Sequence, residues 1–98
     1  MRPCKRIEIV IEEPMAPKLV ELLDSLKTPG YTILPNAAGD GDRGIRRADE
    51  LAGDSSNTVF IIASEDDALL ERIVEGVRPL LSRSGGMCMV SDAMLLMH

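Results

Sequence analysis

The chain has 98 residues, the size of one domain, and we expect residues 1–98 to fold as a single unit. Its net charge of −5 and its aromatic content of 2% argue against a nucleic-acid-binding protein, because such proteins need a basic surface and rings that stack on bases. The two cysteines, Cys4 and Cys88, lie far apart and share no ligand spacing with a histidine, so the sequence supports neither a disulfide scaffold nor a zinc site.

The apolar stretches of the chain are too short for a membrane protein. None approaches the ~20 residues that span a bilayer as a helix. Glu8, Glu12 and Glu13 interrupt the segment that would have to be apolar in a signal peptide. We therefore expect a cytoplasmic protein with no direct membrane insertion.

The first part of the chain predicts a strand, a helix and a second strand. Residues 5–12 alternate between isoleucines and mostly charged residues, which is typical of a strand with one buried face. Pro17 suits the first turn of a helix, which residues 29 and 30, Pro-Gly, should end. The helix is indicated by Leu19, Leu22, Leu23 and Leu26, which recur at helical spacing. Residues 31–34 predict a strand that ends at Pro35.

The last part predicts a strand, a helix and a final strand. Residues 58–63 are apolar on both faces, which indicates a strand buried on both sides. Ser64 is expected to cap the next helix, and Pro79 to distort or end its last turn. The inward stripe of this helix consists of Leu69, Leu70, Ile73, Val77, Leu80 and Leu81. Residues 82–86 predict a short loop, and residues 87–97 a fourth strand.

The order of elements is β-α-β-β-α-β, the split βαβ arrangement of the ferredoxin-like α+β fold. Two helices cover one face of a four-stranded sheet, yet the third and fourth strands are apolar on both faces. One face carries Phe60, Ile62, Cys88 and Val90, and the other Val59, Ile61, Met87 and Met89. We therefore expect a homo-oligomer whose sheets face inward.

Residues 37–57 form a long connection between the second and third predicted strands. Loops of about twenty residues without regular structure are uncommon in small domains and usually have a function. The first part, residues 39–47, combines glycines that let a phosphate approach the backbone with arginines that can bind it. A flexible, solvated loop is the competing interpretation. Ser55 and Ser56, at the far end, could accept a phosphate group, although serines are common in loops.

Few residues suit catalysis. His98, the only histidine, is the last residue and has no orienting partner. The acidic residues at positions 12 and 13, and at 66 and 67, fit solvated charges or a helix N-terminus better than an acid–base pair.

Four segments together resemble the PII signalling family, and most closely its PII-like branch associated with inorganic-carbon uptake and carboxysomes. They are Gly-Tyr-Thr-Ile at 30–33, Gly-Asp-Gly-Asp-Arg-Gly-Ile-Arg at 39–46, Ile-Ile-Ala-Ser-Glu-Asp-Asp at 61–67 and Ser-Gly-Gly-Met-Cys-Met-Val at 84–90. The resemblance covers nearly the whole chain. It places the family's T-loop at about residues 37–57 and a shortened B-loop at about residues 82–86.

The resemblance implies a homotrimer that binds adenine nucleotides in the clefts between neighbouring subunits. Thr32 and a backbone group near Ile62 would meet the adenine. Gly39 and Gly41 would meet the ribose and phosphates, and Arg43 and Arg46 the phosphates and bicarbonate. Arg83, Gly85 and Gly86 would close the cleft from the B-loop side.

The resemblance further implies a non-enzymatic, cytoplasmic bacterial regulator that needs no cofactor. ADP or AMP together with bicarbonate are the expected ligands. ATP should bind more weakly, because Met87 stands where nitrogen-sensing members have a phosphate-binding lysine. The T-loop would contact a partner such as a bicarbonate transporter or another membrane protein. It contains no tyrosine, so uridylylation is not expected.

Two other functions remain open on the sequence alone. One is a small phosphohydrolase that uses the same arginines on a nucleotide or an acyl phosphate. The other is a metal-tolerance trimer resembling CutA, which the lack of a visible Cys/His/carboxylate cluster disfavours.

Overall fold

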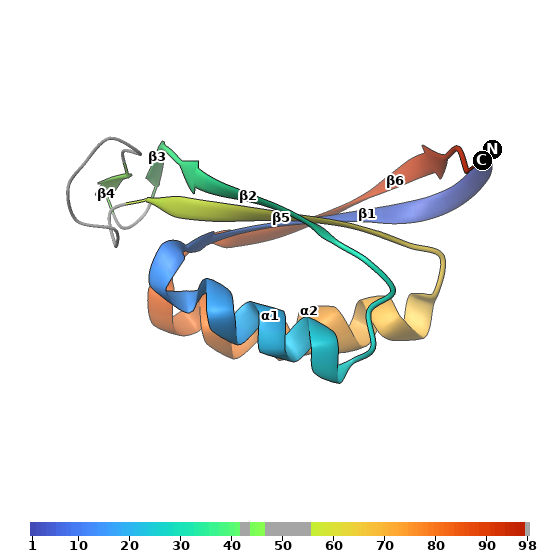
Figure 1. The fold of residues 1–98 in the computed structure, drawn as a ribbon, viewed down its shortest axis with the longest axis horizontal. Helices are drawn as coiled ribbons and strands as arrows, with labels where there is room; N and C mark the ends of the chain where they lie inside the picture. Colours follow the sequence, from blue (N-terminus) through green and yellow to red (C-terminus); the bar gives the residue numbers. More distant parts are fainter. Residues whose placement is uncertain (42–43, 47–55, 98) are drawn as a thin grey trace.

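The computed structural model describes residues 1–41, 44–46 and 56–97, and it contains two helices packed on one face of an antiparallel sheet (Figure 1). The elements are β1 (Arg2–Glu12), a 3-10 turn (Glu13–Met15), α1 (Ala16–Ser25), β2 (Thr32–Ala37), β3 (Gly39–Gly41), β4 (Gly44–Arg46), β5 (Asn57–Ser64), α2 (Asp67–Ser84) and β6 (Met87–Leu95).

The main sheet has the strand order β2-β5-β1-β6, with antiparallel neighbours throughout. The first strand of the chain therefore lies in the interior of the sheet, between β5 and β6, while β2 and β6 form the edges. This order confirms the predicted ferredoxin-like fold. The two termini lie side by side at one end of the sheet, opposite the end that carries β3 and β4 (Figure 1).

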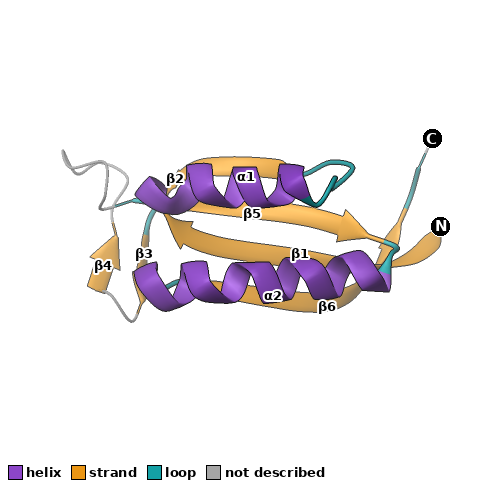
Figure 2. Ribbon diagram, turned by 90° about the horizontal axis from the view of Figure 1, so that it is seen from below, coloured by secondary structure: helices purple, strands orange, loops and turns teal. Residues whose placement is uncertain are grey.

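The core lies between the sheet and the helices. Ile7, Ile9 and Ile11 of β1 have no exposed surface, and their cross-strand neighbours on β5 are Ile62, Phe60 and Thr58. Figure 2 shows α1 over the β2–β5 side of the sheet and α2 over the β1–β6 side. The buried helix residues are Leu19 and Leu23 on α1, and Leu69, Ile73 and Val77 on α2. The alternating isoleucines predicted this face correctly, since a strand repeats every two residues.

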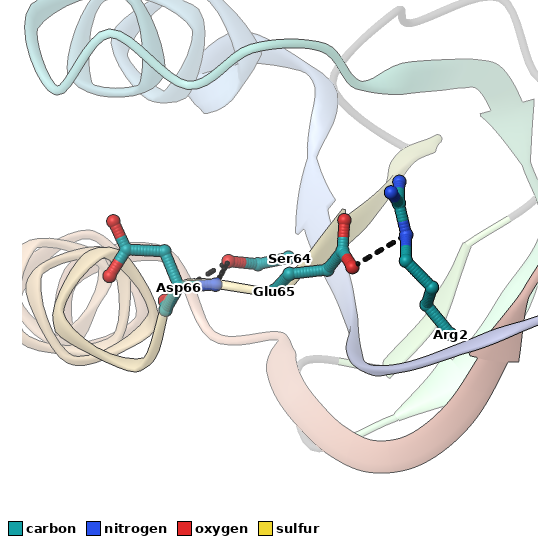
Figure 3. Close-up of polar contacts among 4 residues, drawn as sticks. All are labelled: Arg2, Ser64, Glu65 and Asp66. Carbon is teal, nitrogen blue, oxygen red and sulfur yellow. Dashed lines mark hydrogen bonds and ion pairs between the residues drawn. The ribbon is translucent and has the colours of Figure 1, made fainter. Parts of the chain in front are cut away.

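Helix α2 begins two residues later than the cap predicted from Ser64. Ser64 is the last residue of β5, and its hydroxyl oxygen accepts the N–H of Asp66 at 3.1 Å (Figure 3). Asp66 is the N-cap, because its Oδ1 accepts the N–H groups of Ala68 and Leu69 at 2.9 and 3.2 Å. Glu65 points the other way and pairs with Arg2 of β1, with 3.0 Å between Oε1 and Nε. The junction is thus held both to the helix and to the first strand.

Two prolines that could end an element according to the sequence do not end it. Strand β2 continues through Pro35 to Ala37, and its register against β5 shifts between Leu34 and Ala37. A proline is tolerated there because β2 is an edge strand. Helix α2 continues for five residues beyond Pro79, to Ser84. Leu80 and Leu81 pack against the core, and this tertiary contact outweighs the missing hydrogen bond.

The two predicted loops are also more ordered than expected. Most of residues 82–86 belongs to α2, so the B-loop turn consists of Gly85 and Gly86 alone. Within residues 37–57, Ala37 ends β2, Asn57 begins β5, and β3 and β4 form a short antiparallel hairpin. The prediction of a connection without regular structure was therefore wrong for this part.

Neither helix of the described residues lies on the second face of the sheet. Its side chains include Leu34 of β2, Val59 and Ile61 of β5, Val10 of β1, and Met87 and Met89 of β6. Leu34, Met87 and Met89 are nearly half exposed in the single chain. Apolar residues in one continuous patch indicate an interaction surface, and the inward-facing sheets expected from the sequence stay a prediction.

Candidate functional site

Thr32 and Ile62, expected at the adenine, lie close to each other in the sheet. Thr32 is the first residue of β2, is exposed, and pairs with Ile61 of β5. The side chain of Ile62 is buried in the core and only 1% exposed. Only the main chain at position 62 could therefore contact a ligand.

Tyr31, which precedes Thr32, positions this part of β2. Its hydroxyl donates to the carboxylate of Asp24 on α1 at 2.8 Å, and this hydrogen bond raises the pKa of Tyr31. The centre of its ring lies 6.2 Å from the centre of the Phe60 ring. The sequence identified Tyr31 only as a strand residue, because its link to Asp24 depends on how α1 packs.

Gly39, Gly41 and Arg46 belong to the hairpin. Gly39 pairs with Arg46, and Gly41 pairs with Gly44. The backbone of Arg46 is therefore held opposite a glycine that was predicted to meet the ribose and phosphates. Arg43 lies outside the described residues, as does Ser55.

The B-loop residues lie at the end of α2. Arg83 is exposed in the last helical turn, and the N–H of Gly85 donates to the carbonyl of Leu81 at 2.8 Å. Gly86 has a φ of +107°, and a Cβ atom there would lie 2.2 Å from the carbonyl oxygen of Val10. Glycine is required at this position, because it brings the turn against the backbone of β1.

The hairpin and the B-loop turn lie at the same end of the sheet. Ala37 pairs with Asn57, Asn57 with Glu12, and Val10 with Met87, so these segments meet the same strand ends. Strand β1 separates β5 from β6, which leaves roughly 10 Å between the latter two. The N–H of Glu13 donates to the carbonyl of Ser56 at 3.0 Å and fixes the return into β5. The structure thus brings the glycine-rich hairpin and the B-loop turn to one end of the sheet. The third predicted group, Thr32 with the backbone at Ile62, lies further along the strands.

Ser56 is 3% exposed, and this burial bears on its suggested role as a phosphate acceptor. A hydroxyl without solvent access cannot be phosphorylated unless the local structure opens. The structure therefore disfavours Ser56 as a modification site.

A groove lies at the opposite end, between the end of α1 and the start of α2. It has a volume of about 580 Å³, and its polar lining includes Lys27, Ser64, Asp66 and Arg72. Its apolar lining includes Pro29 and Ala63, which are neighbours in sequence of the Thr32 and Ile62 segments. The sequence did not predict this groove, because its walls come from segments about forty residues apart.

The other resolved pKa shifts lie away from the predicted site residues. The hydrogen bond and charge of Lys5 hold the pKa of Asp92 below its usual value, and the same contacts with Asp92 raise the pKa of Lys5. Burial raises the pKa of the Cys88 thiol. Across residues 1–41, 44–46 and 56–97, no three His, Cys, Asp or Glu side chains gather as a metal site would require. In the same part of the chain, neither helix could cross a membrane.

The fold is a small ferredoxin-like α+β domain, and a glycine-rich hairpin is inserted between strands β2 and β5 of its sheet. The chain belongs to the PII family, since the family described as nitrogen regulatory protein P-II matches residues 4–97. PII proteins are non-enzymatic signalling regulators and form homotrimers. The family assignment confirms the resemblance seen in the sequence and replaces the two alternatives, phosphohydrolase and CutA-like trimer.

Solved structures show the same similarity. The chain resembles CPII, a nitrogen regulatory PII-like protein from Thiomonas intermedia, in a structure bound to ADP, AMP and bicarbonate: the TM-score is 0.79 and the identity 28%, over 93% of this chain and 86% of that chain. For CPII bound to ADP and bicarbonate, the TM-score is 0.78 and the identity 30%, over 93% and 86%.

A third structure, of a candidate PII-like signalling protein from Thermus thermophilus, has a TM-score of 0.73 and 29% identity over 94% of this chain and 88% of that chain. No curated protein sequence matches the chain.

Proposed function

We propose that this chain is a nucleotide-sensing PII-like regulator that binds ADP or AMP, together with bicarbonate, in the clefts of a homotrimer. The observation that carries the proposal is its similarity to CPII over 93% of the chain, because CPII has been solved with ADP, AMP and bicarbonate. Binding of these ligands changes the conformation of the T-loop and thereby its fit to a partner.

The arrangement of the predicted residues supports a cleft between subunits. Thr32 lies on an exposed edge strand, several residues along β2 from the hairpin, while Gly85 and Gly86 lie beyond β1. One subunit alone does not surround a nucleotide with all three groups. A neighbouring subunit placed against the edge of the sheet would complete the site.

The contacts that we assign within this cleft are those that the resemblance to the PII family implies, and the chemistry of the groups suits them. Thr32 and the backbone at Ile62 bind the adenine, and the backbones of Gly39 and Gly41 approach the ribose and phosphates. Arg43 and Arg46 bind the phosphates and bicarbonate through charge-assisted hydrogen bonds. Arg83, Gly85 and Gly86 close the cleft.

The expected preference among adenine nucleotides follows from the positive charge that the site can offer to the phosphates. A triphosphate carries more negative charge than a diphosphate, and Met87 supplies no cation beside the B-loop turn. We therefore expect ADP and AMP to bind more tightly than ATP. The partner that binds the T-loop is a membrane protein of inorganic-carbon uptake, such as a bicarbonate transporter.

Calorimetry tests the ligand assignment. AMP, ADP, ATP and cyclic AMP are titrated into the protein with and without bicarbonate. We expect ADP or AMP to bind most tightly, and bicarbonate to change that affinity. Tighter binding of ATP than of ADP would overturn the preference, and no binding of any nucleotide would overturn the proposal.

Substitution of the arginines tests the site. Arg43→Ala and Arg46→Ala are each expected to weaken nucleotide or anion binding by about 1 to 3 kcal/mol, the usual contribution of a charge-assisted hydrogen bond. Arg78→Ala, on the exposed side of α2, is the matched control and should bind as the wild type does. Wild-type affinity in both test variants would remove the basis for this assignment.

A further inference from the structure

The helix-free face of the sheet carries an ion pair between Arg6 and Glu8 within its apolar surface. Arg6 and Glu8 both lie on β1, an interior strand, and both point to this face. The cross-strand neighbours of Glu8 are Ile61 and Met89, and those of Arg6 are Ala63 and Ser91. The charged pair is therefore flanked on both sides by apolar or small residues.

Within one chain, this pair is poorly satisfied. Arg6 Nη2 and Glu8 Oε1 are 3.4 Å apart, longer than the 2.7–2.9 Å typical of a charge-assisted hydrogen bond. A guanidinium group has five N–H donors, and this contact uses one. The side chains are 49% and 27% exposed, so water can satisfy the remaining groups in a single chain.

Assembly into a trimer would remove the water that satisfies Arg6 and Glu8 in the single chain. If the trimer of the proposed function buries this face, water leaves and each charge needs a partner. In a threefold ring, the two subunits at each interface contribute different surfaces. Arg6 of one subunit can therefore contact Glu8 of the next. Arg6 and Glu8 carry opposite charges and therefore suit that arrangement.

We propose that Arg6 of each subunit pairs with Glu8 of its neighbour around the threefold axis, and that this ring of ion pairs selects another copy of the same chain as the partner. The proposal rests on the trimeric assembly of the proposed function. The apolar residues around the pair provide the contact area. The ion pairs provide the specificity, because a subunit with a different charge pattern would bury unpaired charge.

Charge reversal in the full-length chain tests the proposal. In Arg6→Glu, positions 6 and 8 are both negative, and in Glu8→Arg both are positive. Each variant alone is expected to lose the trimer and to have the 10.7 kDa mass of the single chain by native mass spectrometry. Mixing the two variants should recover assemblies that contain both chains, less stable than the wild-type trimer, because a ring of two chains of one variant and one of the other has two interfaces with opposite charges and one with like charges. The double variant Arg6→Glu with Glu8→Arg should form trimers by itself.

The mixture distinguishes contacts between chains from contacts within a chain. Each single variant keeps like charges in its own chain after mixing, so only pairing across the interface can restore assembly. Circular dichroism of each variant establishes that it is folded before mixing. Glu75→Arg is the matched control: it reverses the charge in the exposed Arg78–Glu75 pair of α2 and should leave the trimer intact.

Two results would overturn the proposal. One is a stable trimer in both single variants. The other is a double variant that forms trimers while the mixture of single variants forms no species that contains both chains, which would make the pair important within each chain only. Nucleotide binding by a trimeric wild type would leave the proposed function standing in either case.

Discussion

At the scale of single residues, Gly86 lies in a position that suits no residue with a side chain. Its φ of +107° is unfavourable for any other residue, and an added Cβ would meet a backbone oxygen of β1 at 2.2 Å. We expect Gly86→Ala to lower the free energy of unfolding by roughly 2 to 4 kcal/mol, since backbone strain and overpacking add. Urea unfolding at a fixed protein concentration measures this.

Gly30→Ala is the control for Gly86→Ala, because a Cβ at Gly30 meets nothing within 4 Å. Its effect should be smaller than that of Gly86→Ala by at least about 1 kcal/mol. Equal stabilities of the two variants would show that the B-loop turn does not constrain β1.

The Lys5–Asp92 pair allows a prediction about titration. Lys5 on β1 lowers the pKa of Asp92 on β6, first through a hydrogen bond and second through its charge. Since the pKa is lower in the folded state, the stabilisation is present above the unfolded-state pKa and is lost as the pH falls through the folded-state pKa. Lys5→Met should return the pKa of Asp92 to its ordinary range.

The pKa of Asp92 can be followed by a carbon NMR titration of its carboxyl group. Lys18→Met, which removes a positive charge from exposed α1, is the control and should leave this pKa unchanged. An Asp92 pKa that is the same in Lys5→Met and in the wild type would contradict the ion pair.

At the scale of elements, α2 contains a proline that its packing tolerates. Pro79 has no N–H for the carbonyl of Glu75, yet the helix continues to Ser84. Proline costs about 3 kcal/mol relative to alanine in a helix interior, and part of this is offset because proline restricts the unfolded chain. We expect Pro79→Ala to raise the free energy of unfolding by about 1 to 2 kcal/mol in thermal or urea unfolding.

Pro17→Ala is the matched control for Pro79→Ala. Pro17 lies in the first turn of α1, where an N–H has no partner within the helix. Pro17→Ala should therefore not raise the free energy of unfolding by a comparable amount. If both substitutions stabilise the protein equally, relief of a missing helical hydrogen bond is not the cause.

At the scale of the whole molecule, the helix-free face is expected to decide assembly. Met89 is 48% exposed in the single chain and lies beside Glu8 on that face. Met89→Lys should therefore leave the fold intact, as judged by circular dichroism, but reduce the trimer to monomers in light scattering. Nucleotide affinity should fall with it, because the proposed clefts need two subunits.

Glu71→Lys, on the exposed surface of α2, should change neither the assembly nor the nucleotide affinity. A Met89→Lys variant that remains trimeric would show that this face is not the contact between subunits. A monomeric wild type would contradict the trimer itself.

The sequence predicted the strands and helices well where periodicity was strong. The isoleucines of β1 and the leucines of α1 each place their apolar groups on one side, and this pattern depends only on local geometry. It failed at Pro35, Ser64 and Pro79, where the outcome depends on neighbours elsewhere in the chain. An edge position, a nearby aspartate and core packing by Leu80 and Leu81 decided these three cases.

The candidate site was predicted by resemblance, and the structure describes where only some of its residues lie. Thr32 pairs with Ile61, and the hairpin and the turn at Gly85 and Gly86 lie at the same end of the sheet on either side of β1. Arg43 lies outside the described residues, so its role stays a prediction.

The sequence by itself determined the order of the two helices and of the four strands of the main sheet, the buried face of β1 and of the helices, and the family, because periodicity and short motifs are properties of neighbouring residues. Only the tertiary structure decided that β2 is an edge, that Gly86 lies against the carbonyl oxygen of Val10, and that Arg6 and Glu8 share the helix-free face with Ile61 and Met89. These relations join residues far apart in the chain, and they arise when strand pairing sets the register between them.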